Sequence, residues 1–352
     1  MSRIAVFEEP QQSVVLEDSD VLPDDCLRLL LATDWGTGGL RYRMEDVSDV
    51  AMRLPKAHYL TLRQRGRAIA TLTLVPHTFR IEGVQVRALF RCLLAVDGEF
   101  QGQGFGTLIA EHARRTFLDH SREPTLLYGF VESDNHRSRR VQERTGYEPF
   151  GEFQFTNFGY LRPRASPAVA CLAAHEVVRL RQELQTFYAD HTLCEFDDSL
   201  VQREYWVLRE GSQIIAGAQV VPRQLSVRDL AGVSGQLLRM ASPVLQRITP
   251  FFRLEHRRFL WFGNLFFRGD DARPLTRLLE AILAQFGVPA GGLYSDLRSS
   301  RFAALQRAGL GLLHQMSPQQ KLTVFVGHCN VPEPVLARIR KGPIAYSPLD
   351  CT

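Results

Sequence analysis

Long hydrophobic runs, paired cysteines and an early apolar leader are all missing from the sequence. No apolar stretch approaches the roughly 20 residues that a membrane-crossing helix needs, so we expect no membrane partner. The first ten residues carry charge too early for a secretory signal peptide, and we expect a cytoplasmic protein. The six cysteines include no CxxC pair and no zinc-ligand spacing with histidine, which argues against a disulfide framework and a bound metal.

A large charge of one sign is also absent. The 42 Lys and Arg residues nearly balance the 38 Asp and Glu residues, and the net charge of +4 is spread along the chain. This balance argues against nucleic acid as a partner but suits a small anionic ligand. Hydrophobic residues make up 45% of the chain, enough for packed cores, and the length of 352 residues favours two domains. We expect a monomer or a homodimer.

The sequence carries the same plan twice. Two apolar runs around a polar turn predict a β-hairpin, and an amphipathic stretch of helical period follows, then a short segment that ends in glycine and a large apolar residue. The first copies lie at residues 59–76, 107–117 and 141–147, and the second copies lie at residues 205–222, 276–286 and 304–310. Because the matches keep the same order, we infer a duplication.

A boundary between the copies is expected at residues 161–167, where two prolines and a serine interrupt the periodicity. We therefore predict one α/β domain over residues 1–163 and another over residues 168–352. Further elements predicted before the first hairpin are a strand around residues 14–16 and helices near residues 23–33 and 45–54.

A glycine-rich turn joins an apolar strand to a helix within residues 89–107. Glycines in such a turn let backbone N–H groups approach phosphate oxygens and tolerate positive φ. The helix N-terminus adds roughly half a positive charge, which attracts an anion. We therefore predict a pyrophosphate-binding turn over residues 101–107. A dinucleotide-binding G-x-G-x-x-G is the rival interpretation, but the third glycine and the alternating βαβ context are missing.

Two motifs give the sequence a resemblance to the GNAT superfamily of acyl-CoA-dependent N-acyltransferases. The family's pyrophosphate motif, Gln/Arg-x-x-Gly-x-Gly/Ala, is matched by Gln101, Gly104 and Gly106. Its second motif is an apolar strand ending in valine, then an asparagine, a helix and a Gly-aromatic pair. The corresponding residues here are Val131, Asn135, Gly146 and Tyr147. The resemblance covers residues 1–160 and implies two tandem GNAT-like domains, each with a mixed, mostly antiparallel sheet flanked by helices.

The resemblance also implies a reaction. An acyl-CoA, most simply acetyl-CoA, donates its acyl group to an amine that attacks the thioester directly, without a covalent intermediate and without a metal. The thioester lies in a splay between the fourth and fifth strands of such a domain, with its carbonyl held by backbone N–H groups. The residues expected to bind the coenzyme are Ala95, Val96, Gln101, Gly102, Gln103, Gly104, Phe105, Gly106, Thr107, Asn135 and Arg139.

The acid of this reaction is not fixed by the motifs. In many family members a tyrosine seven residues after the motif asparagine protonates the departing thiolate, but here that position is Gln142. An amide donates a hydrogen bond without giving up its proton. Tyr147 is the candidate acid and Tyr128 its alternative; otherwise the coenzyme leaves as a thiolate, which its intrinsic pKa of about 8.5 tolerates, or this half reacts slowly.

The base is equally open. The strand before the turn contains no carboxylate, so Glu132, at the end of the next strand, is the candidate base, with a water chain to solvent as the alternative. Asp97, Glu99 and Asp134 stand behind it, and Asp134 is also suited to cap the following helix. Trp35, in the glycine-rich segment between the first two helices, either plugs the core or touches a substrate.

The second copy has lost the residues of the coenzyme motif. Larger or acidic side chains stand there, which would fill the space of the phosphates or repel them. The residues aligned with Gln101, Gly104, Gly106 and Asn135 are Asp270, Arg273, Leu275 and Arg298. This half then serves as a structural partner or builds the acceptor pocket. In its residues 251–262 we expect aromatics in the core, with Arg253 and Arg257 exposed.

The resulting prediction is an N-acetyltransferase of undefined acceptor. The alternative is a coenzyme-A-binding sensor or interaction module with little turnover, which Gln142 and the missing strand carboxylate favour.

Overall fold

The computed structural model divides the chain into two compact units. Unit 1 comprises Met1–Phe150 and Thr323–Arg338, and unit 2 comprises Gly151–Leu322 and Ile339–Cys351. The structure describes residues 2–9, 12–37, 40–196, 205–230, 232–247, 253–311, 314 and 320–347. Within these residues, no helix is long and apolar enough to cross a membrane.

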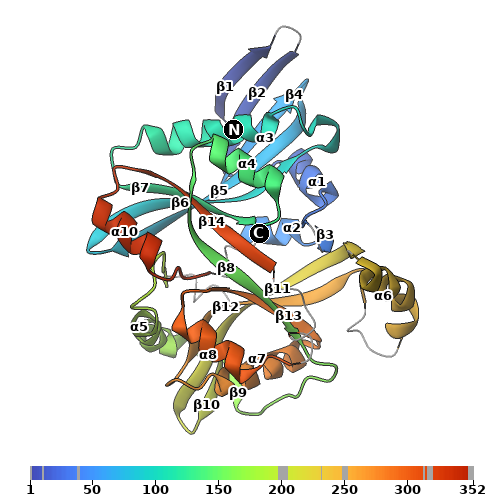
Figure 1. The fold of residues 1–352 in the computed structure, drawn as a ribbon, viewed down its shortest axis with the longest axis vertical. Helices are drawn as coiled ribbons and strands as arrows, with labels where there is room; N and C mark the ends of the chain where they lie inside the picture. The colour runs from blue at the N-terminus through green and yellow to red at the C-terminus, as the bar shows by residue number, and fades with distance from the viewer. Residues whose placement is uncertain are drawn as a thin grey trace. The chain divides into compact units, whose positions relative to one another are not determined.

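Unit 1 is built on a sheet in the strand order β1-β2-β4-β5-β6-β7-β14 (Figure 1). Its strands are β1 (Ser2–Glu9), β2 (Gln12–Ser19), β3 (Leu40–Met44, outside this order), β4 (His58–Gln64), β5 (Arg67–Ile81), β6 (Val84–Val96), β7 (Thr125–Glu132) and β14 (Gln320–Cys329). Its helices are α1 (Asp24–Ala32), α2 (Val47–Arg53), α3 (Phe105–Arg114), α4 (His136–Arg144) and α10 (Glu333–Lys341), and α3 continues as a π-helical turn over Arg115–Asp119.

Both faces of this sheet are covered, which explains why consecutive residues are buried in β4 and β5. On one face, Thr61 of β4 contacts Cys26 of α1 at 3.0 Å, and the hydroxyl of Tyr59 donates to the carbonyl of Ala51 in α2. On the other face, Leu60 and other strand residues join one apolar cluster with Ile109 of α3. The alternation of side chains along β4 thus positions α1 and α2 opposite α3.

Unit 2 repeats the plan with a sheet in the order β8-β13-β12-β11-β10-β9. Its strands are β8 (Glu148–Gly159), β9 (Val169–Cys171), β10 (Tyr205–Glu210), β11 (Gln213–Leu230), β12 (Arg257–Phe267) and β13 (Ala290–Asp296). Its helices are α5 (Val177–Phe187), α6 (Gly232–Leu245), α7 (Arg273–Phe286) and α8 (Ser300–Ala308). Apolar residues of α5 and α7 join the strands in one buried cluster.

Each unit completes its sheet with a strand from the other half of the sequence. In unit 1, β14 lies beside β7, although it follows α8 in the chain. In unit 2, β8 pairs antiparallel with β13, although it follows α4 directly. The division into two units depends on which strands pair with one another. The boundary expected at residues 161–167 depends instead on where the sequence repeat begins again.

The predicted fold class is confirmed. In unit 1 the β6–β7 pair is parallel and the pairs β1–β2, β2–β4, β4–β5 and β5–β6 are antiparallel. In unit 2 the β12–β13 pair is parallel and the pairs β8–β13, β9–β10, β10–β11 and β11–β12 are antiparallel. Both sheets are therefore mixed and mostly antiparallel, with helices against them.

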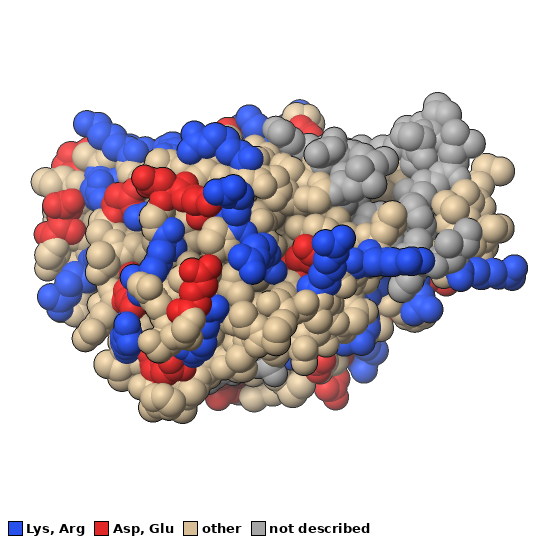
Figure 2. Space-filling view, turned by 90° about the horizontal axis from the view of Figure 1, so that it is seen from below, with Lys and Arg blue, Asp and Glu red and all other residues tan. Residues whose placement is uncertain are grey.

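One expectation for residues 251–262 was wrong. Phe259 and Phe262 are buried and Arg253 is exposed, as expected, but Arg257 is only partly exposed and its Nε is buried. Burial lowers the pKa of Arg257 to about 10. The alternation of β12 places Arg257 on the same face as Phe259, so its side chain follows that face inward. On the surface shown in Figure 2, basic and acidic side chains are interspersed.

Candidate functional site

A bulge near the end of β6 opens the candidate site. In the pairing with β5, Thr71 lies opposite Ala95 and Thr73 opposite Cys92, so Leu93 and Leu94 together face one residue. Leu93 is buried and has φ of 51°, a conformation that L-residues rarely adopt. A strained non-glycine residue of this kind persists where the surrounding fold requires the bend.

The bulge coincides with the end of the pairing between β6 and β7. The parallel register runs from Arg87 opposite Thr125 to Arg91 opposite Gly129. At this last pair the strands approach so closely that a Cβ on Gly129 would meet the carbonyl oxygen of Arg91 at 2.9 Å. The pairing ends at the place where the sequence analysis expects a splay between the two strands.

The predicted pyrophosphate turn lies directly after this bulged strand. Gly102 and Gly104 have φ of 81° and 90°, and Gly104 is the N-cap of α3 in the left-handed conformation. A Cβ on either glycine would meet no atom within 4 Å, so the space around the turn is open. Thr107 and Leu108 donate their backbone N–H groups to the carbonyl of Gly104, and the N–H groups of the two residues before them precede the first bond of the helix. Such a turn can receive a phosphate group.

Polar side chains hold the turn in place. Gln101 Nε2 donates to the carbonyl of Val96 at 3.2 Å, and Gln103 Nε2 donates to the carbonyl of Glu99 at 3.0 Å. Arg67 binds Asp97 at 2.5 Å and Glu99 at 3.0 Å. The carboxylates of Asp97 and Glu99 therefore stabilise the turn through their ion pairs with Arg67. The sequence analysis considered both carboxylates as candidate bases and did not foresee their ion pairs with Arg67.

Glu132 lies at the end of β7, and a threonine holds it. Thr37 Oγ1 donates to Glu132 Oε2 at 2.5 Å. Thr37 belongs to the segment after Trp35, which is fixed by paired backbone hydrogen bonds between Trp35 and Tyr42. The Nε1 atom of Trp35 is buried, with no hydrogen-bond partner in the described part of the chain. The only sequence signal for Thr37 was its place beside Trp35.

The motif asparagine begins α4. Asn135 is the N-cap, and its Oδ1 accepts a hydrogen bond from the backbone N–H of Ser138 at 3.0 Å. Asp134, which the sequence analysis had considered for this role, is exposed and does not cap the helix. Arg139 donates to the carbonyl of Ser133 at 3.3 Å, so its guanidinium folds back toward the end of β7.

Gln142 and Tyr147 are both buried. Gln142 is 4% exposed, and its Oε1 has no hydrogen-bond partner among the described residues. The guanidinium of Arg91 lies 3.6 Å from the centre of the Tyr147 ring. Burial raises the pKa of Tyr147, and the charge of Arg91 offsets part of that effect. Arg91 is a residue that the sequence analysis missed, although it is the one charge between Leu89 and Val96.

The remaining candidate lies in the core. Tyr128 is 2% exposed and packs against aromatic rings, among them Phe90 at 5.2 Å between centroids. Among the described residues, no cluster of His, Cys, Asp and Glu forms that could hold a metal.

Unit 2 has the same bulge and strand divergence. Asn264 and Leu265 of β12 lie opposite the single Ala218, and Asn264 has φ of 46°. The parallel pairing of β12 with β13 is recorded up to Phe262 opposite Leu293. The bulge that β6 and β12 share is stronger support for an internal repeat than their common fold is. A bulge is a local feature, and two unrelated sheets of the same fold need not share it.

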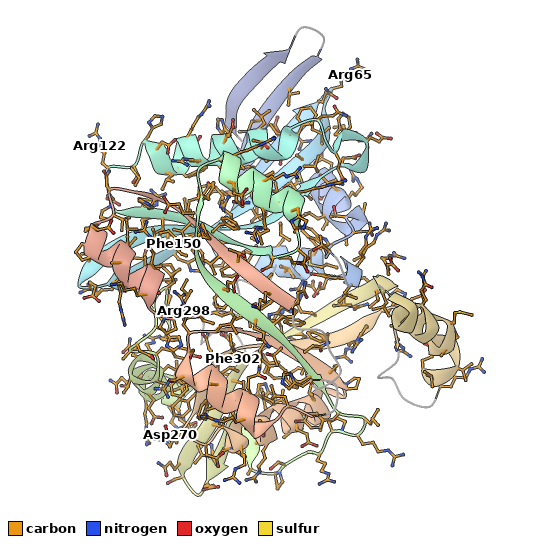
Figure 3. All side chains as sticks on the ribbon, in the orientation of Figure 1. Arg65, Arg122, Phe150, Asp270, Arg298 and Phe302 are labelled. Atoms are coloured by element: carbon orange, nitrogen blue, oxygen red, sulfur yellow. The ribbon has the colours of Figure 1, made fainter. Side chains whose placement is uncertain are left out.

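The turn before α7 differs from the turn before α3. The N-cap of α7 is Ala272 with φ of −84°, and Pro274 removes a backbone N–H from the first turn. Leu275 is fully buried, and Asp271 forms an ion pair with Arg273 at 2.7 Å. The neighbouring Asp270 is labelled in Figure 3. No glycine in the left-handed conformation opens this helix.

The alignment of Asn135 with Arg298 was wrong by one residue. The N-cap of α8 is Ser299, the counterpart of the N-cap Asn135. Arg298 instead binds Asp296 at 2.6 Å. The sequence alignment failed here because the loop that precedes α8 carries no residue identical to the first copy.

Comparison with known proteins places this geometry in a class. Residues 26–147 match the model of the acetyltransferase (GNAT) family. N-myristoyltransferase from Saccharomyces cerevisiae with bound myristoyl-CoA has a similar structure, with a TM-score of 0.59, 11% sequence identity and coverage of 90% of this chain and 84% of that chain. A GCN5-related N-acetyltransferase from Sphaerobacter thermophilus gives a TM-score of 0.51 at 12% identity, covering 89% of this chain and 95% of that chain. No curated protein matches the sequence significantly.

The bulged strand and the glycine turn both lie within the residues that match this family model. The first half of the chain thus carries a match to the GNAT family model, and the similarity of whole structures shows that the tandem GNAT-like fold extends over most of the chain.

Proposed function

We propose that the protein is an N-acyltransferase that moves an acetyl or other short acyl group from acyl-CoA to an amine. One observation carries the proposal: the left-handed Gly104 opens α3 directly beside the diverging ends of β6 and β7. The turn offers backbone N–H groups to a pyrophosphate, and the divergence offers space for a thioester. The eleven coenzyme-binding residues expected from the sequence remain part of this proposal.

Glu132 is the proposed base that removes the proton from the attacking amine. Its carboxylate lies at the end of β7, and the hydrogen bond from Thr37 fixes its orientation. A base must reach the proton that it abstracts, and a held carboxylate loses less freedom in doing so. Tyr147 remains the proposed acid, because burial raises its pKa and keeps its proton bound; departure of the coenzyme as a thiolate is the alternative.

Unit 2 is proposed to be a GNAT-like domain without a coenzyme site. Pro274 and the buried Leu275 stand where a phosphate-binding turn needs N–H groups and open space. One coenzyme then binds per chain. The interspersed charges in Figure 2 give no support to nucleic acid as a partner.

The proposal is tested by the release of free thiol from acetyl-CoA in the presence of a panel of amines. We expect release that depends on at least one amine. The buried amide of Gln142, which cannot supply a proton, favours the sensor as the second candidate. Tight binding of acetyl-CoA without release for any amine would establish the sensor and exclude the enzyme.

Glu132→Gln tests the base. We expect kcat to fall by about 100-fold to 10,000-fold, the usual contribution of general base catalysis, and the acid limb of the pH–rate profile to disappear. Thr37→Val should lower kcat less, and Thr37→Ser should restore it. Glu143→Gln, which alters an exposed carboxylate on α4, is the control. An unchanged pH–rate profile in Glu132→Gln would assign the proton to water instead.

A further inference from the structure

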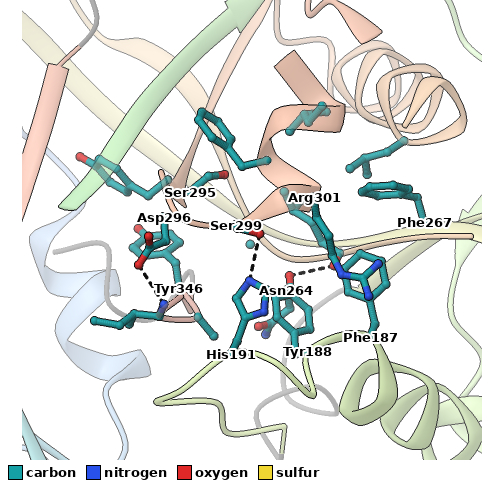
Figure 4. A pocket seen from close by; sticks show the side chains of 18 residues that line it. Phe187, Tyr188, His191, Asn264, Phe267, Ser295, Asp296, Ser299, Arg301 and Tyr346 are labelled. Atoms are coloured by element: carbon teal, nitrogen blue, oxygen red, sulfur yellow. Dashed lines mark hydrogen bonds between the residues drawn. The ribbon is translucent and has the colours of Figure 1, made fainter. Parts of the chain in front are cut away.

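A pocket in unit 2 lies where β12 and β13 diverge. Its cavity volume is about 50 Å³, and the aromatic side chains of Phe187, Tyr188, Tyr294 and Tyr346 contribute to its wall (Figure 4). His191, Ser299 and Arg301 also line it. Because all these residues belong to unit 2, the pocket is independent of the coenzyme turn of unit 1.

Two side chains of this pocket, His191 and Ser299, form a chain of hydrogen bonds with the neighbouring Asp190. Asp190 Oδ1 lies 2.7 Å from His191 Nδ1, and His191 Nε2 lies 3.2 Å from Ser299 Oγ (Figure 4 draws the second bond). Both distances are within the reach required of a base and its partner. The imidazole is 5% exposed and packs edge-on against Tyr188, 4.9 Å between ring centroids, so its orientation is fixed.

Ser299 does not behave as an ordinary helix cap. Serine at an N-cap usually accepts a hydrogen bond from the first turn of its helix. Asn135 does so at the corresponding position of unit 1, whereas the side chain of Ser299 makes no capping bond to α8. Its hydroxyl is directed to His191 instead. The pocket residues Arg301 and Phe302 lie in the first turn of α8, directly after this serine, and the first N–H groups of a helix have no intrahelical partner.

The surroundings of His191 favour a neutral imidazole. Burial lowers its pKa, and the hydrogen bond and charge of Asp190 oppose that effect. The other charges near it are Asp296 and Arg301. Asp296 is held by Arg298 and by the backbone N–H of Ile344, and Arg301 stacks on Phe187 at 3.7 Å. A neutral imidazole with a free lone pair on Nε2 can accept a proton from the serine.

We propose that Ser299, His191 and Asp190 form a second catalytic site, which hydrolyses short acyl esters or thioesters. Ser299 Oγ attacks the acyl carbonyl carbon while its proton passes to His191 Nε2. The bond to the leaving alcohol or thiol breaks, and that group takes the proton from His191. The oxyanion is stabilised by the first-turn N–H groups of α8. Water then attacks the acyl-serine, gives a proton to His191, and releases a carboxylic acid as Ser299 regains its proton.

The size of the cavity sets the substrate class. A volume of about 50 Å³ admits an acyl group of a few carbons but not a long chain. The aromatic wall suits an apolar acyl group without a charge. Hydrolysis of p-nitrophenyl acetate should therefore exceed that of p-nitrophenyl octanoate by at least about 10-fold, the factor that separates substrates by pocket fit.

The test uses the full chain and a fluorophosphonate, which forms a covalent adduct with activated serines. Peptide mass spectrometry should locate the adduct on Ser299. Ser299→Ala and His191→Gln should each slow labelling and p-nitrophenyl acetate hydrolysis by at least about 100-fold, and Asp190→Asn should slow them by a smaller factor. Ser300→Ala and His175→Gln alter exposed neighbours and should leave both rates within about twofold.

Two further variants keep the outcomes separable. Gly104→Glu should leave labelling of Ser299 unchanged, since it alters only unit 1. If Ser299→Ala fails to fold, Ser299→Cys replaces it: iodoacetamide should alkylate the introduced thiol faster than the exposed Cys171, because His191 would withdraw its proton. An adduct on another residue, no adduct at all, or alkylation slower than at Cys171 would overturn the proposal.

Discussion

Single residues decide how unit 1 presents its turn to a ligand. Gly104 supplies positive φ at the start of α3, and Leu93 also has positive φ without being glycine. Positive φ at Gly104 costs little free energy because glycine has no Cβ. At Leu93 it costs of order 1–3 kcal/mol, which the packing of the surrounding strands must offset. The strain therefore lies at the place where β6 leaves β7.

Gly104→Glu should weaken binding of acetyl-CoA by about 100-fold or more. The added carboxylate repels the pyrophosphate, and loss of two charge-assisted hydrogen bonds at about 1.5–3 kcal/mol each has that effect alone. Isothermal titration calorimetry measures the change.

Gly83→Glu is the matched control, because Gly83 also has positive φ, 76°, and open space around a Cβ, but lies in the hairpin turn between β5 and β6. Both variants carry the same backbone strain, so their melting temperatures should fall together. Equal affinity for acetyl-CoA in the two variants would place the pyrophosphate elsewhere.

At the scale of elements, an ion-pair cluster joins α1 to β4. Arg63 binds both oxygens of Asp25 and also Glu17 at 2.7 Å. Burial alone would raise the pKa of Asp25, but the hydrogen bond and charge of Arg63 outweigh it and lower the pKa below its ordinary value of 3.8. The ionised carboxylate is therefore the form that stabilises the fold.

Asp25→Asn should destabilise the protein only where Asp25 is ionised. The stabilisation is fully present above pH 3.8 and is lost as the pH falls through the lowered folded-state pKa. The unfolding midpoints of the variant and the wild type should thus differ at neutral pH and converge at more acidic pH. Asp24→Asn, at the exposed neighbour, should differ little from the wild type at either pH. A difference that persists below the folded-state pKa would show that Asp25 acts without its charge.

The sequence predicted elements well and contacts between them less well. The hairpins near residues 59–76 and 205–222 were predictable because side-chain alternation is a local property, and the helix after Gly104 because its apolar residues recur with helical period. The partners of β8 and β14 were not, because strand pairing between distant segments leaves no periodic signal. The contact of Thr37 with Glu132 was not predictable either, because Thr37 lies in an irregular loop that has no periodic pattern.

At the scale of the whole molecule, the last part of the chain completes the first unit. Gly327 of β14 lies so close to Tyr147 that a Cβ would stand 2.8 Å from its ring and 3.0 Å from Leu118. The Tyr147 ring is itself held by Arg91. The same tyrosine thus connects the end of the chain with the strand that forms the splay.

Gly327→Ala should lower the free energy of unfolding by about 1–3 kcal/mol, the usual cost of overpacking a core. Denaturant titration measures this loss. In a Tyr147→Leu background the ring is gone, so the added methyl group should cost less, and the double-mutant cycle should show coupling. Full additivity of the two changes would mean that β14 does not pack on Tyr147.

The place of β14 has a consequence for synthesis of the protein on the ribosome. Unit 1 is translated up to Phe150 long before the ribosome reaches Thr323. At roughly 5–20 residues per second, the interval is on the order of tens of seconds. Throughout that time the edge of β7 is without its final neighbour, and Tyr147 lacks the strand that covers it. During this period the nascent chain exposes an unpaired strand edge and an aromatic side chain, to which a chaperone can bind. The period ends when β14 has been synthesised and pairs with β7.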